Sequence, residues 1–378
     1  MRLQQQHFIN GFWREEYAEA GFDAQHCQLV LAFGSPANIT NPAAYAYLKE
    51  GYPQANIVFS STSGEIITDT VYDDSIAVTA VEFERTSLKI FSTHISAHSN
   101  SFEAGSYLME QAIGEELAGV FILSDGTFIN GSELIAGFNS KNSAGVPVTG
   151  GLAGDADRFA ATYTGVNAVP TQGNVIAVAF YGNNLKITFG SCGGWDEFGP
   201  ERTITRSEHN VLYEIDGKNA LDLYKEYLGD YARELPGSAL LFPLSLRIDS
   251  DGKSLVRTIL SVDEQQNSMT FAGNLPEGSK VRLMKANFDN LIEASSSAAD
   301  DSVAESPAPE LAIMVSCVGR KLVLNERTDE ELIAAKEIFG DNTAMTGFYS
   351  YGELSPLADN KTCELHNQTM TITTFTEA

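Results

Sequence analysis

The chain has 378 residues and carries 50 Asp and Glu against 24 Lys and Arg, which gives a formal net charge of −26 at pH 7. That charge argues against nucleic acid as a partner, because a phosphate-binding face needs clustered Lys and Arg, and it disfavours anionic membrane surfaces. Hydrophobic residues make up 43% of the chain, enough for packed cores, so a disordered protein is excluded. The length suits two or three domains.

The sequence shows no sign of export or membrane insertion. Residues 1–10 lack the cationic segment and apolar run of a signal peptide, and no apolar run reaches the ~18 residues that span a bilayer. The four cysteines are scattered, with no Cys-x-x-Cys pair, so neither a disulfide framework nor a structural zinc site is expected. We therefore expect a cytoplasmic protein.

A unit of strand, helix and strand is predicted near the start of the chain. Asn41 is the expected N-cap of its helix, and Pro42 suits the first turn. The expected elements are a weakly helical lead-in at 1–28, a strand at 27–33, a helix at 41–49, a strand at 56–59, a turn at 60–65, and strands at 75–83 and 88–95.

The same order recurs in the middle of the chain, which predicts an internal duplication. The apolar run at 174–180 also resembles the one at 75–83 in its letters. The expected elements are a strand at 119–124 that ends at Asp125-Gly126, a helix at 132–139, a strand at 146–149, a glycine turn at 150–155, and strands at 159–166, 174–181 and 185–189.

A third unit is predicted between residues 311 and 374. Thr328 is the expected N-cap of its helix, and Glu331 is the expected capping-box acid. The expected elements are a strand at 311–317, a break at Gly319, a helix at 329–339, a strand at 344–348 and a turn at 350–353.

Three glycine turns therefore occupy equivalent places in the three units: Gly64-Glu65, Gly154-Asp155 and Gly352-Glu353. Ligands in open α/β sheets bind just beyond the carboxyl ends of strands. The three turns either line one site or are simply three tight turns.

Between the second and third units we expect a helix at 219–228, and strands at 240–248 and 255–262 around the turn Asp249–Gly252. The Ser- and Ala-rich segment 287–309 starts helical and is the expected flexible part. The predicted fold class is mixed α/β (α+β), with repeated strand–helix–strand units, additional antiparallel strands and two domains. The predicted boundaries are a lead-in at 1–28 and domains at 29–215 and 216–378.

Polar groups collect at element ends in the third unit, where binding groups are often found. Arg320 follows an apolar strand and must find an anion, either a ligand or a protein carboxylate such as Glu353. The run His366–Gln368 precedes an apolar strand, so it predicts either ligand binding or an internal hydrogen-bond network. The candidate ligand-binding residues are Arg320, Tyr349, Tyr351, Glu353, His366, Asn367 and Gln368.

Other reactive patterns carry less weight. Arg320 follows Cys317 closely in the sequence, and a neighbouring guanidinium would lower the pKa of the thiol. The alternative function is therefore a hydrolase or transferase that uses Cys317 and His366. The other interpretation of Cys317 is a buried, inert cysteine. His94 and His98 have no third metal ligand nearby, and His209 has no supporting context. The glycine-rich run 190–195 lacks the pattern of a nucleotide site.

Together these motifs resemble the FIST family, in which a FIST N domain precedes a FIST C domain. The N-terminal likeness runs from Leu29 to Trp195, and residues 205–206 and 213–217 resemble the junction. The C-terminal likeness is the more specific. It rests on Ser316-Cys-Val-Gly-Arg320, Gly347-Phe-Tyr-Ser-Tyr-Gly-Glu353 and Leu365-His-Asn-Gln-Thr369. On this likeness, 29–215 is FIST N-like and 216–378 is FIST C-like.

The resemblance implies an intracellular, non-enzymatic sensor that binds a small ligand, such as an amino acid or a related metabolite, and reports to a signalling partner. The chain is similar to the stand-alone bacterial nitric-oxide-sensing FIST proteins, which bind haem and modulate histidine kinases or cyclic-di-GMP enzymes. That likeness implies haem as a cofactor. Since haem iron needs an axial ligand such as His or Cys, His366 is the candidate ligand.

Overall fold

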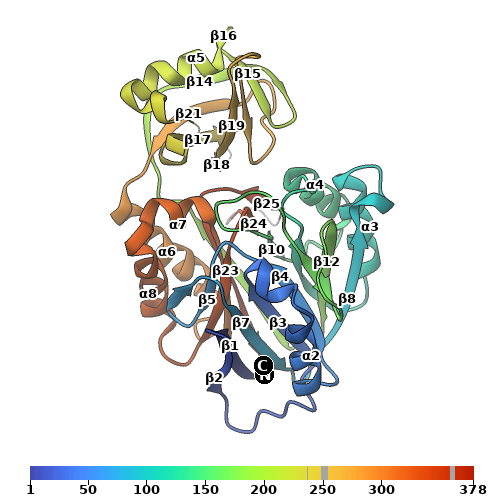
Figure 1. The fold of residues 1–378 in the computed structure, drawn as a ribbon. Helices are drawn as coiled ribbons and strands as arrows, with labels where there is room; N and C mark the ends of the chain where they lie inside the picture. Colours follow the sequence, from blue (N-terminus) through green and yellow to red (C-terminus); the bar gives the residue numbers. More distant parts are fainter. Residues whose placement is uncertain (236, 248–253, 358–361) are drawn as a thin grey trace.

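The computed structural model describes residues 1–235, 237–247, 254–357 and 362–378, which form two bodies (Figure 1). The larger body contains three six-stranded sheets and is built from residues 1–192 and 288–378. The smaller body contains an eight-stranded sheet built from residues 196–285. The predicted fold class, with repeated strand–helix–strand units and two domains, is confirmed. The predicted boundaries at 28/29 and 215/216 do not coincide with the two bodies, because the larger body takes strands from both ends of the chain.

The first sheet has the order β11-β4-β3-β7-β1-β2, in which only β3 and β4 are parallel neighbours. Its strands are β1 (Arg2–Ile9), β2 (Phe12–Ala18), β3 (Leu29–Gly34), β4 (Asn56–Ser61), β7 (Ile76–Glu82) and β11 (Thr164–Val166). Helices α1 (Pro36–Ile39) and α2 (Pro42–Gly51) connect β3 to β4. As predicted, the Asn41 side chain caps α2.

The second sheet has the order β25-β24-β10-β9-β12-β8, in which only β9 and β10 are parallel. Its strands are β8 (Ser87–His94), β9 (Leu117–Ser124), β10 (Val148–Leu152), β12 (Asn174–Tyr181), β24 (Gly352–Pro356) and β25 (Cys363–His366). Helix α4 (Gly131–Lys141) connects β9 to β10, and η1 (Ile95–Ala97) and α3 (Ser101–Ala112) precede β9.

The third sheet has the order β13-β26-β22-β23-β5-β6, in which only β22 and β23 are parallel. Its strands are β5 (Glu65–Ile67), β6 (Thr70–Tyr72), β13 (Leu185–Cys192), β22 (Leu311–Cys317), β23 (Ala344–Ser350) and β26 (Met370–Glu377). Helices α7 (Val318–Leu324), η4 (Asn325–Arg327) and α8 (Thr328–Phe339) connect β22 to β23, and α6 (Phe288–Val303) precedes β22.

The three sheets repeat one plan and exchange strands in a ring. Each has a central parallel pair, and the strand after the pair crosses into a neighbouring sheet: β5 pairs with β23, β11 with β4, and β24 with β10. Because every unit completes the sheet of another unit, the three cannot separate without breaking backbone ladders. The three repeated units of the sequence are thus one closed body.

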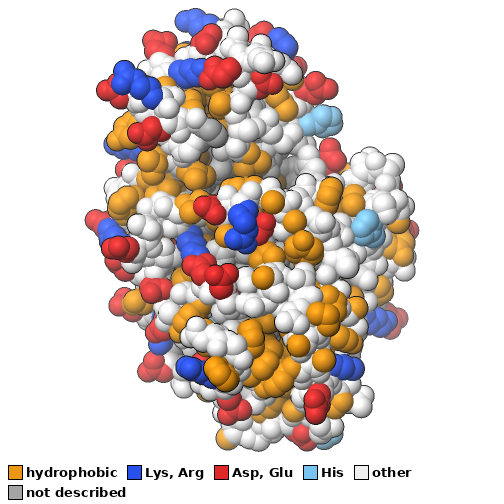
Figure 2. Space-filling model, in the orientation of Figure 1, with side chains coloured by type: hydrophobic (Ala, Val, Ile, Leu, Met, Phe, Trp, Pro, Cys, Tyr) orange, Lys and Arg blue, Asp and Glu red, His pale blue; other side chains and the backbone are white. Residues whose placement is uncertain are grey.

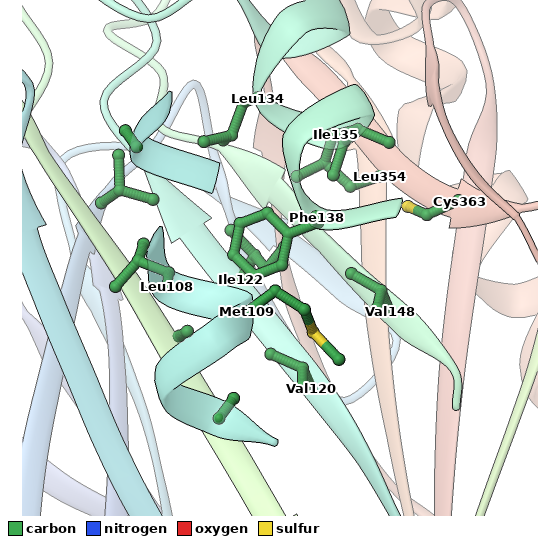
Figure 3. Close-up of a cluster of buried hydrophobic side chains, with 14 of the residues drawn as sticks. Leu108, Met109, Val120, Ile122, Leu134, Ile135, Phe138, Val148, Leu354 and Cys363 are labelled. Atoms are coloured by element: carbon green, nitrogen blue, oxygen red, sulfur yellow. The ribbon is translucent and has the colours of Figure 1, made fainter. Parts of the chain in front are cut away.

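The main core lies where the three sheets face one another. It includes Leu31 and Phe33 of β3, Phe121 of β9, and Val315 and Phe348 of the third sheet, all buried, and the rings of Phe33 and Phe348 lie 4.8 Å apart. A second core lies between the second sheet and helices α3 and α4, where Phe138 and Met109 point toward Ile122 (Figure 3). Cys363 is part of that apolar core.

The smaller body is a curved antiparallel sheet whose described residues also form one α-helix and two short 3-10 helices. Its strand order is β18-β17-β21-β14-β15-β20-β19, and β16 pairs with β15. Its elements are β14 (Asp196–Glu208), β15 (Val211–Ile215), β16 (Lys218–Asn219), α5 (Ala220–Leu228), η2 (Gly229–Glu234), η3 (Gly237–Leu241), β17 (Leu244–Arg247), β18 (Leu255–Arg257), β19 (Ile259–Asp263), β20 (Ser268–Phe271) and β21 (Lys280–Lys285). The predicted pairing across Asp249–Gly252 is confirmed by β17 and β18, although the turn itself lies outside the described residues.

Two sequence predictions about whole segments are wrong. The lead-in 1–28 is not helical, because Leu3, Gln5 and His7 alternate with more exposed residues and Asn10-Gly11, both with positive φ, turns β1 into β2. The segment 287–309 is not a flexible linker either. Its small residues, such as Ala294 and Ala298, are buried because α6 packs closely on β13 and α8.

Three local predictions also need correction. Gly319 does not break the chain but lies inside α7, and the residue before α8 is Arg327 rather than Thr328, with no side-chain cap. Glu331 is not a capping-box acid, since its side chain is fully buried against Arg320. The predicted strand 159–166 is reduced to β11.

Within the described residues, no helix is both long enough and apolar enough to cross a bilayer.

Helices α3 and α4 approach each other through two glycines, which predicts an unusual response to a glycine-to-alanine change. A Cβ on Gly105 would lie 2.1 Å from the Leu134 carbonyl oxygen, and one on Gly137 would lie 2.1 Å from the Phe102 carbonyl oxygen. Gly105→Ala should therefore lower the free energy of unfolding by about 1–3 kcal/mol, although alanine favours helix. Gly51→Ala in α2 is the control, because nothing lies within 4 Å of that site. Urea denaturation measures both; equal stability of the two variants would contradict the close helix contact.

Candidate functional site

The three glycine turns meet at one junction in the larger body. The Ser63 N–H donates to the Tyr349 carbonyl at 2.8 Å, and the Tyr349 N–H donates to the Gly64 carbonyl at 2.9 Å. The Gly154 N–H donates to the Ser61 carbonyl at 2.9 Å. The turns therefore do lie together, but their backbone groups bond to each other. Of the two interpretations left by the sequence, the contacts favour a structural junction.

Two of the turn carboxylates have the same buried arrangement. Glu65 accepts from the Thr62 hydroxyl at 2.5 Å and from the Ser75 N–H at 3.0 Å. Glu353 accepts from the Ser350 hydroxyl at 2.7 Å and from the Thr369 N–H at 3.3 Å. Burial raises the pKa of Glu65 to about 7 and that of Glu353 to about 8. In both turns the carboxyl group of the crossing strand bonds back to the sheet that the chain has just left, at the residue before β7 for Glu65 and at the residue before β26 for Glu353.

Arg320 and Glu331 form an ion pair in which neither side chain is exposed. The Arg320 Nε and Nη2 lie 3.0 and 2.7 Å from Glu331 Oε2. The other oxygen, Oε1, accepts from the Tyr349 hydroxyl at 2.5 Å and from the Ser316 hydroxyl at 3.0 Å. The sequence predicted that Arg320 would pair with either a ligand or a protein carboxylate. It pairs with a protein carboxylate, but the acid is Glu331 rather than Glu353.

The same guanidinium holds both chain crossings between the two bodies. Its Nη1 donates to the Gly193 carbonyl at 2.7 Å, at the first crossing, and its Nη2 donates to the Leu291 carbonyl at 2.7 Å, just after the second. Gly194 between them has φ +74°, and a Cβ there would lie 2.3 Å from the Asn290 carbonyl oxygen. The glycine-rich run 190–195 therefore allows the backbone to pass close to α6, since a Cβ on Gly190 would also lie 2.0 Å from the Ala298 carbonyl oxygen.

The run His366–Gln368 lies at the same boundary. The His366 ring Nε2 lies 2.9 Å from the Ser355 carbonyl oxygen, and burial lowers the pKa of His366 to about 4. The Trp195 indole N–H donates to the Gln368 carbonyl at 2.8 Å, and Gln368 Nε2 lies 3.5 Å from the Leu240 carbonyl oxygen of the smaller body.

Only some of the hydrogen-bonding groups of the run His366–Gln368 have partners. Asn367 Nδ2 donates to the His366 carbonyl at 2.9 Å. Asn367 Oδ1 and Gln368 Oε1 are buried and have no hydrogen-bond partner among the described residues. Both outcomes predicted for this run therefore keep some support, and its ligand-binding role stays a prediction.

Cys317 does not have the surroundings of a nucleophile. Its side chain is buried, and burial raises the pKa of the thiol despite the nearby Arg320. The His366 imidazole is held by the Ser355 carbonyl. These contacts give no support to a hydrolase or transferase that uses Cys317 and His366. Within the described ranges, no group of three or more His, Cys, Asp or Glu is placed to hold a metal ion.

Tyr351 lies next to the junction of the turns and also lines a cleft of about 340 Å³ between the two bodies. The ring of Tyr351 stacks on that of Phe159 at 4.5 Å and 18°, and the Tyr351 hydroxyl accepts from the Phe159 N–H at 2.9 Å. In Figure 2 a notch separates the smaller body from the α3–α4 side of the larger one. The cleft is lined by Gly126, Thr127, Phe128, Ile129, Asn130, Leu152, Phe159, Asn210, Leu260, Phe271, Ala272, Gly273 and Tyr351.

Of the seven predicted ligand-binding residues, only Tyr351 lines this cleft. The other six are buried in the contacts that join the turns and the chain crossings: Arg320, Tyr349, Glu353, His366, Asn367 and Gln368. Sequence reasoning missed the loop 126–130 and the wall from the smaller body. The predicted strand end at Asp125-Gly126 could have pointed to the loop, because binding groups often follow strand ends. No sequence pattern marked the lining residues of the smaller body.

Polar contacts join the two bodies around the cleft. Asn130 Nδ2 donates to Asn274 Oδ1 at 3.0 Å, and the His209 ring lies 3.5 Å from the Glu133 carboxylate. Arg257 donates to the Leu365 carbonyl at 3.0 Å. A buried apolar cluster also joins the two bodies; it contains Val256 and Met284 of the smaller body and Leu291, Val323 and Leu324 of the larger one.

Glu331 is expected to stabilise the fold strongly. Glu331→Gln removes the charge that balances a fully buried guanidinium, so the free energy of unfolding should fall by about 3–5 kcal/mol in urea denaturation. Glu330→Gln breaks the neighbouring exposed pair with Arg327 and should leave the urea midpoint unchanged. Similar midpoints for the two variants would contradict the importance of the buried pair.

The two raised carboxyl pKa values predict how stability depends on pH. Both lie above the ordinary value of 4.5, so the folded state binds protons more tightly than the unfolded state. Their stabilisation is complete below pH ~4.5 and is lost as pH rises through about 7 for Glu65 and about 8 for Glu353, by at most ~1.4 kcal/mol per pH unit for each group. Urea midpoints measured from pH 5 to pH 8 should fall less in the Glu65→Gln/Glu353→Gln variant than in the wild type. Glu337→Gln, on the exposed face of α8, should behave as the wild type; a double variant that matches it would refute this dependence.

Comparison with known proteins agrees with the motifs. A FIST N domain model matches residues 28–218, and a FIST C domain model matches residues 220–356. The uncharacterised protein MJ1623 of Methanocaldococcus jannaschii is 28% identical over 199 residues, which is 48% of this chain but only 37% of that relative's length. FIST domains are in general small-ligand sensory domains in signalling rather than catalytic domains. Since the two domain models together match nearly the whole chain, this protein belongs to the FIST family, with a FIST N domain followed by a FIST C domain.

Proposed function

We propose that this protein senses a small ligand in the cleft between its two bodies and passes the signal to a partner protein in the cytoplasm. The observation that carries the proposal is the cleft itself. Its volume of about 340 Å³ suits a small molecule, and three exposed apolar side chains, Phe128, Phe159 and Leu260, converge on it. Exposed apolar groups that meet at one recess are typical of a binding site.

The signal would be a change in the angle between the two bodies. A ligand in the cleft contacts Phe159 and Tyr351 of the larger body and Leu260 of the smaller one, so it binds one angle better than others and shifts the population toward it. Tyr351 adjoins the turn at Gly352-Glu353, and the Arg320 guanidinium holds both crossings. In this proposal Arg320, Tyr349, Glu353 and His366–Gln368 transmit binding without touching the ligand.

The family resemblance supports a finer proposal, in which the ligand is haem and the protein is a nitric oxide sensor for a histidine kinase or a cyclic-di-GMP enzyme. His366 does not fit as an axial ligand, since it is buried and held by the Ser355 carbonyl. His209 fits better. Its side chain is 67% exposed beside the cleft residue Asn210, and Nδ1 lies 3.5 Å from Glu133. A carboxylate on one ring nitrogen is the usual support for a metal on the other. Haem, when bound, would supply the iron that takes up nitric oxide.

Thermal melting tests the proposal with the purified full chain, a panel of amino acids and related metabolites, and haemin. A compound present at ~100 times its Kd should add about 2.7 kcal/mol of stability. The shift should be lost in Tyr351→Ala and kept in Tyr107→Ala, an exposed tyrosine on α3. If no compound raises the melting temperature, or if Tyr351→Ala keeps the shift, the cleft is not the sensing site.

Haemin titration followed by absorption tests the finer proposal. A Soret band should appear, survive in His366→Ala and disappear in His209→Ala. Absence of the band in the wild type would remove haem and leave the metabolite panel. A band lost only in His366→Ala would show that the region around β25 opens to admit haem.

A further inference from the structure

The cleft contains no charged side chain among its lining residues, which restricts what it can hold. We infer that its ligand is an uncharged, flat ring compound with an N–H or O–H donor on one edge. This inference rests on the proposed function, because it assumes that the cleft is the sensing site, and it opposes the finer haem proposal, since haem carries charged propionates. Four features of the lining carry it.

The first feature is the way Phe159 is held. Phe159 has φ +49°, a left-handed backbone conformation that is costly for a bulky residue. Its N–H is fixed by the Tyr351 hydroxyl, and its ring is covered on one face by the Tyr351 ring at 4.5 Å. The side chain is nevertheless 42% exposed. A strained backbone that keeps an aromatic ring half open to a cleft indicates a stacking surface for a second ring.

The second feature is that an anion would find few donors. Three N–H groups of the loop above β9 already donate within the protein: those of Thr127 and Phe128 to Asp125 Oδ1, each at 2.7 Å, and that of Gly126 to the Thr162 hydroxyl at 2.8 Å. The helix that follows is closed by its own cap, since Asn130 Oδ1 accepts from the Glu133 N–H at 3.1 Å. The nearby cation Arg158 is paired with Asp155.

The third feature is that a cation would find no free acid. Both oxygens of the buried Asp125 are occupied, Oδ1 by the loop N–H groups and Oδ2 by the Gly173 N–H at 2.9 Å. Glu133 at the edge of the cleft faces His209. Neither sign of charge is therefore matched in the cleft, and a charged ligand would lose water without gaining a partner.

The fourth feature is a hydrogen-bond acceptor, the side-chain oxygen Oδ1 of Asn210. Asn210 uses its Nδ2 to donate to the Phe271 carbonyl at 2.8 Å, while its Oδ1 receives no hydrogen bond within the described ranges. A ring that stacks on Phe159 can therefore donate an edge N–H or O–H to Asn210. Leu260, which is 44% exposed, supplies an apolar wall from the smaller body.

A matched set of compounds tests the inference: indole as the uncharged flat donor, indole-3-acetate as its anion, tryptamine as its cation and cyclohexanol as an uncharged ring that is not flat. Saturation-transfer NMR and calorimetry on the full chain should show that indole binds at least about tenfold more tightly than each of the other three. Phe159→Leu keeps an apolar side chain but removes the stacking ring, and should weaken indole binding about three- to tenfold. Phe12→Leu, on the outer strand β2, should leave it unchanged.

The outcomes separate this inference from the function on which it rests. If indole-3-acetate, tryptamine, tetramethylammonium or haemin binds more tightly than indole, and Phe159→Leu weakens that binding, the cleft is the site but the ligand is charged, which overturns the inference alone. If cyclohexanol binds as tightly as indole, the ligand need not be flat, which overturns that part of the inference. If all compounds bind equally in Phe159→Leu and in the wild type, the cleft is not the site, and both proposals fail.

Discussion

Arg320 and Glu331 face each other without solvent exposure at the point where β22, β23, α6 and α8 meet the two chain crossings. Burying two opposite charges is costly, and it is sustained only when every donor and acceptor is matched. Here Glu331 is matched by Arg320, Tyr349 and Ser316, while the remaining donors of Arg320 hold Gly193 and Leu291. One buried guanidinium therefore fixes both the third sheet and the base of the smaller body.

The ring exchange of strands gives that pair a rigid setting. Because β5, β11 and β24 each complete a sheet of another unit, the three glycine turns that lead into them must come together. Their backbone hydrogen bonds close the junction, and the carboxyl groups of Glu65 and Glu353 tie two of the crossing strands back to the sheets that the chain has just left. The smaller body joins this frame through two chain crossings, a few polar contacts and a buried apolar cluster that includes Val256, Leu291 and Val323.

Tyr351 is the residue shared by both regions. Its neighbour Tyr349 bonds to Glu331, its own N–H bonds to the Leu152 carbonyl, and its ring and hydroxyl position Phe159 in the cleft. A ligand stacked there would press on a side chain that belongs to the junction. In the proposed function, this arrangement would let a chain whose reactive-looking groups are mostly buried respond to a small molecule.

The sequence by itself determined the repeated strand–helix–strand units, the capping of α2 by Asn41 and the family motifs, because these depend on local periodicity, turn residues and letter order. It also drew attention to Arg320 and to the tyrosines around Gly352. Only the tertiary structure decided that Arg320 pairs with Glu331 rather than Glu353, that α6 is a packed helix, and that Tyr351 meets Phe159 across 192 positions of sequence. The physical reason is the strand exchange: it brings together side chains from different units and from the inserted body, and no local pattern records which of those distant neighbours will satisfy a buried charge or form the wall of a cleft.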